Sequence, residues 1–124
     1  MKKLLTIVIC VLLWVGLAWG EAPFDKAKEF ALKATPDANG SYILRFNINE
    51  DGFETTYLLG YLSKWKVIGV GVIKGSEVCV FQYEEETQEY SVFYNGMVMI
   101  VDKAKVIEGA LIVFRELVKK NLLS

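Results

Sequence analysis

The chain contains no histidine. Histidine is the most common general base near neutral pH and the most common ligand of transition metals, so its absence excludes several chemistries. Ser-His-Asp and Cys-His catalysis, zinc hydrolases and His-ligated haem all depend on this side chain. We therefore predict no catalytic residues, no metal site and no cofactor.

The chain also lacks an excess of charge of either sign. It carries 14 Lys plus Arg against 15 Asp plus Glu, a formal net charge of −1. Proteins that bind nucleic acid normally present a basic patch that displaces counterions from the phosphates. We therefore predict no nucleic-acid partner. The 124 residues are enough for one domain with a core of ordinary size, and not for two.

Cysteine is scarce, with only Cys10 and Cys79 in the chain. Cys10 lies within an apolar N-terminal run, and Cys79 lies in the apolar stretch 78–81. Free cysteine is among the most buried residue types, which favours a packing role for Cys79. If the N-terminal segment is removed, no internal disulfide can form, so the fold depends on its hydrophobic core.

Residues 1–20 have the three parts of a secretory signal peptide. A basic start precedes an uncharged apolar run over 4–17, and Ala18 and Gly20 then place small residues at −3 and −1 before Glu21. The run is shorter than the roughly 20 residues that a bilayer-spanning helix needs. We predict cleavage between Gly20 and Glu21, with Gly16-Leu17-Ala18 as an alternative site two residues earlier, and export to the periplasm or the extracellular space. Membrane contact would be limited to this segment, and an uncleaved N-terminal anchor is the alternative.

The remaining residues, 21–124, are predicted to form a single α+β domain. Apolar residues recur at helical spacing over 23–35, and the breaker residues of 36–40 follow them. A second helix is predicted after Asp102, a good N-cap residue, with a wide apolar face that suits packing on a sheet.

Alternating residues between these helices predict strands. Asp51-Gly52 favours a two-residue turn between strands 42–48 and 53–59, and this turn sets Ile48 opposite Thr55, Phe46 opposite Tyr57 and Leu44 opposite Leu59. Tyrosine and leucine pairs four residues apart leave a helix over 54–64 as the alternative. The other predicted strands cover 66–73, 78–83, 90–94 and 97–101.

Asn95-Gly96 is the second strong turn signal, and the hairpin around it is apolar on both faces. Such a hairpin lies in the centre of a sheet, or else it exposes one face to a partner. Gly69 and Gly71 share one face of their strand, where we expect the last helix to pack.

The predicted fold class is α+β: an antiparallel sheet of about five to six strands made of sequential hairpins, with an N-terminal and a C-terminal helix. The alternation does not determine which face the C-terminal helix covers.

The acidic run Glu84, Glu85, Glu86 and Glu89 is the densest charged cluster. It lacks the Asp/Asn-Gly alternation of a calcium loop, so we interpret it as a solvated hairpin tip. Aromatic residues concentrate in the strands and suit core packing, or binding if one sheet face is uncovered. Four residues are predicted to contact a ligand or partner, of which Trp65 is the most exposed candidate: Trp65, Tyr57, Tyr61 and Ile112.

These patterns favour a small exported protein of the cell envelope that acts by binding, as an adaptor, accessory subunit or ligand carrier, and not as an enzyme. The predicted partner is a protein, or a small apolar or glycan ligand. Two alternatives stay open. One is a His-free enzyme that uses carboxylate or tyrosine chemistry, and the other is an envelope structural protein anchored by an uncleaved N-terminal helix.

Overall fold

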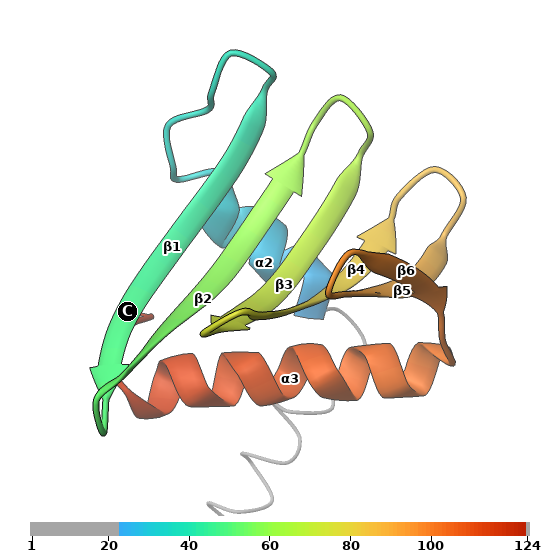
Figure 1. Ribbon diagram of the computed structural model, residues 1–124. Helices are drawn as coiled ribbons and strands as arrows, with labels where there is room; N and C mark the ends of the chain where they lie inside the picture. The colour runs from blue at the N-terminus through green and yellow to red at the C-terminus, as the bar shows by residue number, and fades with distance from the viewer. Residues whose placement is uncertain (1–22, 124) are drawn as a thin grey trace, which may run out of the picture.

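The computed structural model describes residues 23–123. The predicted signal peptide and its cleavage site between Gly20 and Glu21 lie outside these residues. The described part contains two helices and six strands, arranged as Figure 1 shows. Along the chain they are α2 (Pro23–Ala31), β1 (Ser41–Glu50), β2 (Phe53–Leu62), β3 (Val67–Lys74), β4 (Glu77–Glu84), β5 (Glu89–Tyr94), β6 (Met97–Ile100) and α3 (Lys103–Lys119).

The six strands form one antiparallel sheet in which each strand pairs with its neighbours in the chain. This confirms the predicted α+β class and the sequential hairpins. The register of the first hairpin is confirmed as well: Leu44 pairs with Leu59, and Phe46 with Tyr57. Both residues of its turn have positive φ, 50° at Asp51 and 80° at Gly52, as a two-residue hairpin turn requires. The alternative of a helix over 54–64 is wrong.

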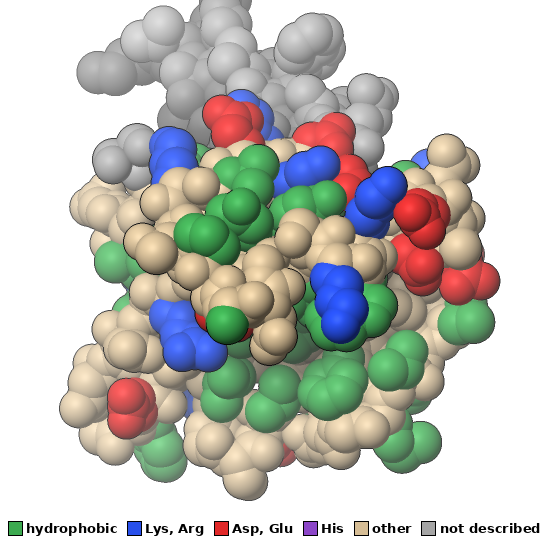
Figure 2. Space-filling model, turned by 90° about the horizontal axis from the view of Figure 1, so that it is seen from above, with side chains coloured by type: hydrophobic (Ala, Val, Ile, Leu, Met, Phe, Trp, Pro, Cys, Tyr) green, Lys and Arg blue, Asp and Glu red, His purple; other side chains and the backbone are tan. Residues whose placement is uncertain are grey.

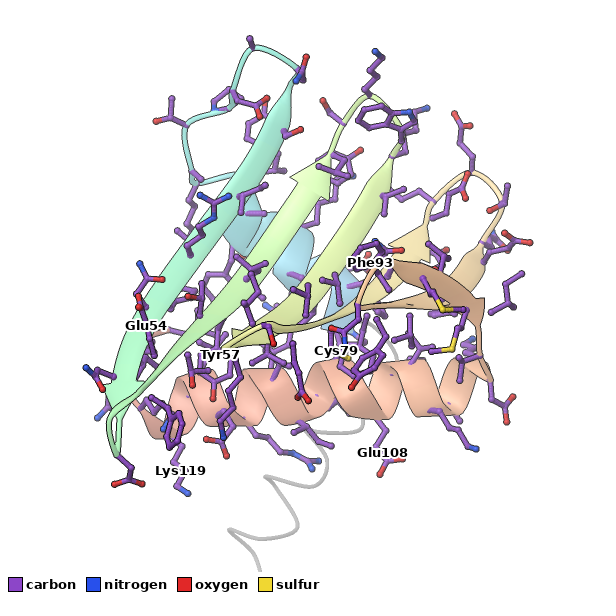
Figure 3. The ribbon with its side chains drawn as sticks, viewed as in Figure 1. Glu54, Tyr57, Cys79, Phe93, Glu108 and Lys119 are labelled. Carbon is purple, nitrogen blue, oxygen red and sulfur yellow. The ribbon has the colours of Figure 1, made fainter. Side chains whose placement is uncertain are left out.

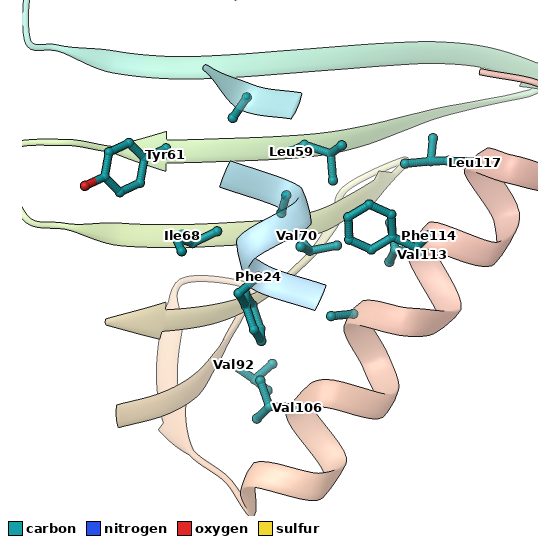
Figure 4. Packing of buried hydrophobic residues seen from close by; sticks show 13 residues of the cluster. Phe24, Leu59, Tyr61, Ile68, Val70, Val92, Val106, Val113, Phe114 and Leu117 are labelled. Carbon is teal, nitrogen blue, oxygen red and sulfur yellow. The ribbon is translucent and has the colours of Figure 1, made fainter. Parts of the chain in front are cut away.

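Both helices pack on the same face of the sheet. α2 lies on β1, β2 and β3, whereas α3 lies on β3, β4 and β5. In Figure 1, α2 is behind the first three strands, so their other face is turned toward the viewer. Figure 4 shows the core between the sheet and the helices. Its buried residues are Phe24, Ala27, Ala31, Leu59, Tyr61, Ile68, Val70, Val92, Val106, Ala110, Val113, Phe114 and Leu117.

The ends of the helices differ in detail from the prediction. α2 ends at Ala31 and not at Thr35, and Lys33 and Ala34 close tighter turns by donating to carbonyls three residues earlier. Pro36 accounts for the exclusion of Thr35 from the helix, because the residue before a proline is disfavoured in the helical conformation. Asp102 is the N-cap residue of α3, as predicted, but its side chain makes no capping hydrogen bond.

The close approach between sheet and helix involves a different glycine from the predicted ones. Gly69 and Gly71 lie on the face opposite the helices, where a Cβ on either residue would meet Val80 of β4. The expectation that the last helix covers these glycines is therefore wrong. Gly109 of α3 makes the close approach instead, since a Cβ there would overlap the ring of Phe81.

The hairpin of β5 and β6 lies at one edge of the sheet, not in its centre. Its register is as predicted, with Val92 opposite Met99 and Phe93 opposite Val98. All four residues of β6 are exposed. Of the two expectations for a hairpin that is apolar on both faces, the central position is therefore wrong.

Candidate functional site

The face of the sheet opposite the helices carries ten apolar residues, together with polar residues such as Arg45 and Asn47 on β1. None of the described elements packs on it, because α2 and α3 share the other face. In Figure 2, hydrophobic side chains gather along the lower part of the view, which is the side turned toward the viewer in Figure 1. Strand register places these apolar residues on this face: Ile43, Leu58, Leu62, Val67, Ile73, Val78, Val80, Phe93, Val98 and Ile100. We call this surface the uncovered face.

A row of small and polar residues crosses the uncovered face at right angles to the strands. Gly60 of β2 is directly opposite Gly69 of β3, and the row continues through Gln82 of β4 to Ser91 of β5. Ile43 and Ile100 close its two ends on the edge strands. Because glycine has no side chain and serine a short one, this row forms the floor of a groove.

Larger side chains form the two walls of the groove. They come from the residues two positions before and two positions after the floor on β2, β4 and β5, and from Val67 alone on β3, where the residue on the other side of the floor is Gly71. Two hollows along the groove have volumes of about 130 Å³ and about 220 Å³. The first is lined by Ile43, Leu58, Gly60, Leu62, Val67, Gly69, Val80 and Gln82, and the second by Val67, Gln82, Glu84, Glu89, Ser91, Val98 and Ile100. Val67 and Gln82 line both, so the hollows are adjacent.

The two ends of the groove differ in polarity. The end over β1 to β4 is apolar, whereas Glu84 and Glu89 lie directly opposite each other across β4 and β5 at the other end. Like charges in directly opposite positions repel each other. Among residues 23–123, no lysine or arginine forms an ion pair with either carboxylate. The groove therefore has an apolar half and an acidic half.

The four residues predicted to contact a ligand are not brought together. Trp65 is 54% exposed in the turn between β2 and β3, beneath the ammonium group of Lys64. Ile112 is 53% exposed on the outer side of α3. Tyr57 and Tyr61 lie on the helix-covered face, where Tyr61 is only 8% exposed. Figure 3 shows Tyr57 on the side of the sheet that faces α3.

The acidic run is only partly the solvated tip that was predicted. Glu86 is exposed and pairs with Lys66, but Glu85 turns inward. Its Oε1 accepts a hydrogen bond from Tyr61 Oη at 2.8 Å, and its Oε2 accepts one from Lys28 Nζ at 2.9 Å. The ammonium group of Lys28 also lies 4.5 Å from the centroid of the Tyr61 ring. These contacts join α2 to β2 and to the β4–β5 turn.

Lys28 and Glu85 each stabilise the ionised form of the other. Burial acts to raise the pKa of Glu85, but the hydrogen bonds from Lys28 and Tyr61 outweigh it, so this pKa lies below its usual value. The hydrogen bond to Glu85 raises the pKa of Lys28, and burial together with that carboxylate raises the pKa of Tyr61. All three shifts hold the groups in one protonation state near neutral pH. This arrangement suits a structural clamp and not proton transfer.

Cys79 is a free, half-buried thiol on β4 that packs against the core, as predicted. Burial raises the pKa of its thiol. A reactive cysteine needs the opposite shift, usually caused by a neighbouring cation or a helix N-terminus. Within residues 23–123, no group of three or more cysteine or carboxylate side chains is arranged to hold a metal ion.

Comparisons of the chain with protein-family models, curated proteins and solved structures found no match. In the described part of the chain, neither helix is long and apolar enough to span a membrane.

Sequence reasoning missed the groove, although its signal is present in the chain. The floor needs glycine at two positions that pair across β2 and β3, so the register of that hairpin has to be known first. The two-residue turns fixed the registers of the first and last hairpins but not of this one. Its turn runs from Ser63 to Lys66, and Lys66 has a φ of 54°.

Proposed function

We propose that this chain is a small exported protein of the cell envelope that acts by binding, and that the groove on the uncovered face is its binding surface. The observation that carries the proposal is the groove itself. It is a depression, apolar over one half, across a sheet face on which none of the described helices packs, and its floor includes the paired glycines Gly60 and Gly69. Extended apolar patches on a protein surface are typical of interaction sites.

The shape and charge of the groove favour a peptide segment of a protein partner. Strands lie about 4.8 Å apart, so the floor from β1 to β6 extends over roughly 24 Å, about seven residues of extended chain. Its apolar half suits aliphatic side chains, and Glu84 and Glu89, which form no ion pair within residues 23–123, suit lysine or arginine at one end. The proposed occupant is therefore an extended apolar segment that ends in basic residues.

Gly60→Val tests this proposal by filling the floor of the groove. A Cβ at Gly60 makes only ordinary contacts, 3.7 Å from the Tyr42 carbonyl oxygen and 3.8 Å from Ile43 Cγ1, and valine favours strands. The fold should therefore survive while the groove is lost. The matched control is Thr56→Val, which puts the same side chain on the same strand and face but outside the groove.

The probes are two synthetic heptapeptides, one with five leucines followed by two lysines and one with five leucines followed by two glutamates. Binding is followed by backbone amide shifts in two-dimensional NMR spectra. We expect the lysine peptide to bind more tightly than the glutamate peptide, and this preference to shrink as salt is added. Gly60→Val should weaken binding by about tenfold or more, whereas Thr56→Val should leave it unchanged. Equal binding to the protein and to Gly60→Val would place the site elsewhere.

Export is tested separately by the mass of the chain purified from the envelope of its host. We expect a chain that begins at Glu21, because signal peptidase cleaves after small residues at −3 and −1. A replacement of the −1 residue, Gly20→Arg, should retain the full-length chain in the membrane fraction. A full-length mass in the unaltered protein would replace this part of the proposal with the uncleaved anchor.

A further inference from the structure

β6 is an edge strand without the usual protection against pairing. Its four residues are all apolar and all exposed: Met97 by 66%, Val98 by 63%, Met99 by 42% and Ile100 by 78%. Natural edge strands normally carry charges, prolines or bulges that prevent another strand from adding to them. β6 has none of the charges or prolines, and among residues 23–123 its one partner strand is β5.

The turn before β6 determines which of its backbone groups point outward. Asn95 and Gly96 have φ values of 46° and 91°, as in a two-residue hairpin turn. The residues that flank such a turn form a hydrogen-bonded pair, and such pairs then alternate along the ladder. Met97 and Met99 therefore direct their N–H and C=O groups toward β5. Val98 and Ile100 direct theirs away from the sheet.

We propose that two copies of this chain form a dimer by antiparallel pairing of β6 with β6. This inference is carried by the outward backbone groups of β6 and does not depend on what occupies the groove, although Val98 and Ile100 also line the groove at its acidic end. The pairing is centred on Met99, so Val98 of one copy is opposite Ile100 of the second copy. In this register Val98 and Ile100 both donate and accept, so the outward N–H and C=O groups of both strands are paired.

The side chains fit the same register. Residues that are opposite each other must point to the same face of a continuous sheet. Val98 and Ile100 both belong to the uncovered face. Met99 of one copy lies opposite Met99 of the second copy, and both point to the helix-covered side. The two-fold axis then continues the sheet and its uncovered face from one copy into the next. Cross-strand pairs of aliphatic residues of this kind stabilise sheets.

β1, the other edge strand of the sheet, is less suitable than a second β6 as a partner for β6. β1 presents Arg45, Asn47 and Asn49 on the uncovered face, where β6 presents only aliphatic side chains. A contact between β6 and β1 would also be head-to-tail and would propagate into fibres, whereas pairing of β6 with itself closes after two copies. The second copy of β6 is therefore the occupant that the edge fits best.

Disulfide cross-linking tests the register. The Cα atoms of a non-hydrogen-bonded antiparallel pair lie about 4.5 Å apart, within the range that a disulfide spans. In a background of Cys10→Ala and Cys79→Ala, Met99→Cys should therefore cross-link into dimers under mild oxidation. The matched control is Met97→Cys. Position 97 is more exposed than position 99, but its two copies would lie about 13 Å apart in the proposed register.

Association is measured by sedimentation of the protein produced from the full-length gene. A four-residue edge is short, so we expect a dissociation constant on the order of 10 µM. Val98→Lys combined with Ile100→Lys places like charges opposite each other and should weaken dimerisation by about tenfold or more. Ile112→Lys, a similarly exposed isoleucine on α3, is the control and should leave the dimer intact.

The outcomes separate cleanly. Selective cross-linking at position 99, with a dimer that the double lysine variant dissociates, supports the proposal. A monomer at about 100 µM, equal cross-linking at 97 and 99, or larger assemblies that persist in the double variant would overturn it.

Amide exchange in the unaltered protein gives a measurement that needs no folded variant. The Val98 and Ile100 amides should gain protection as protein concentration rises, and unchanged exchange would also overturn the proposal.

Discussion

The ring of Phe81 on β4 lies where a Cβ of Gly109 on α3 would have to be. α3 can therefore approach the sheet closely at this point, with its buried residues Val106, Ala110 and Val113 around the contact. Gly109 lowers the stability of the helix itself, because glycine is less favourable than alanine inside a helix by about 1 kcal/mol. The space that the aromatic ring occupies explains why a glycine suits this position in the middle of α3.

Gly109→Ala should consequently destabilise the fold despite its better helix propensity. Displacing the ring and overpacking the core should outweigh the propensity gain, for a net loss of about 1–2 kcal/mol in the free energy of unfolding. The measurement is urea unfolding followed by circular dichroism. The difference between Glu108→Ala and Glu108→Gly, at an exposed interior position of the same helix, gives the effect of propensity alone. Phe81→Leu should restore part of the loss in the Gly109→Ala background, and strictly additive effects would contradict the steric explanation.

Glu85→Gln should remove part of the acid sensitivity of the fold. The pKa of Glu85 is lower in the folded state than its ordinary value of 4.5, so its contribution is present above pH 4.5 and is lost as the pH falls. We expect the variant to be less stable at pH 7 by about 1 kcal/mol and to lose less further stability below pH 4.5. Thermal unfolding from pH 3 to pH 7 measures both effects.

The control for that series is Glu86→Gln, in which the exposed ion pair with Lys66 is lost. Exposed pairs contribute little, so this variant should follow the unaltered protein at every pH. If Glu85→Gln and Glu86→Gln behave alike, the contacts of Glu85 with Lys28 and Tyr61 do not contribute as a clamp.

Cys79 should react slowly with thiol reagents in the folded protein. Burial raises the pKa of its thiol, so less of the reactive thiolate is present at pH 8. In a Cys10→Ala background we expect labelling by iodoacetamide at least about tenfold slower than that of an exposed thiol introduced as Glu86→Cys with Cys79→Ala. Equal rates in the two proteins would show that Cys79 is accessible and ionised, contrary to its packing against the core.

Local patterns predicted the hairpins because the turn chemistry and the alternation agreed. Asp51-Gly52 and Asn95-Gly96 fixed two registers, and the structure has both. The face that the helices cover could not be predicted in the same way. β3 carries Ile68 and Val70 on the covered face and Val67 and Ile73 on the uncovered one, so alternation of polarity gives no preference there.

The clamp between Lys28 and Glu85 could not be predicted for a different reason. The two residues are 57 positions apart, and each looks like an ordinary surface charge in its own segment. Only the docking of α2 over β2 brings them together with Tyr61. In the same way, the edge position of β6 depends on the strand order of the whole sheet, which its own apolar residues do not encode.

The strands of this sheet pair in the order in which they occur in the chain, and this affects how the protein folds. Each pairing closes only a short loop, which costs little chain entropy, so the sheet has few of the distant contacts that slow the folding of sandwiches and barrels. The contacts between the most distant residues come from helix docking, as between Lys28 of α2 and Glu85 in the β4–β5 turn, which are 57 positions apart. We therefore expect hairpins to form early and independently, and the docking of α2 and α3 to be the slow, cooperative step that completes the fold.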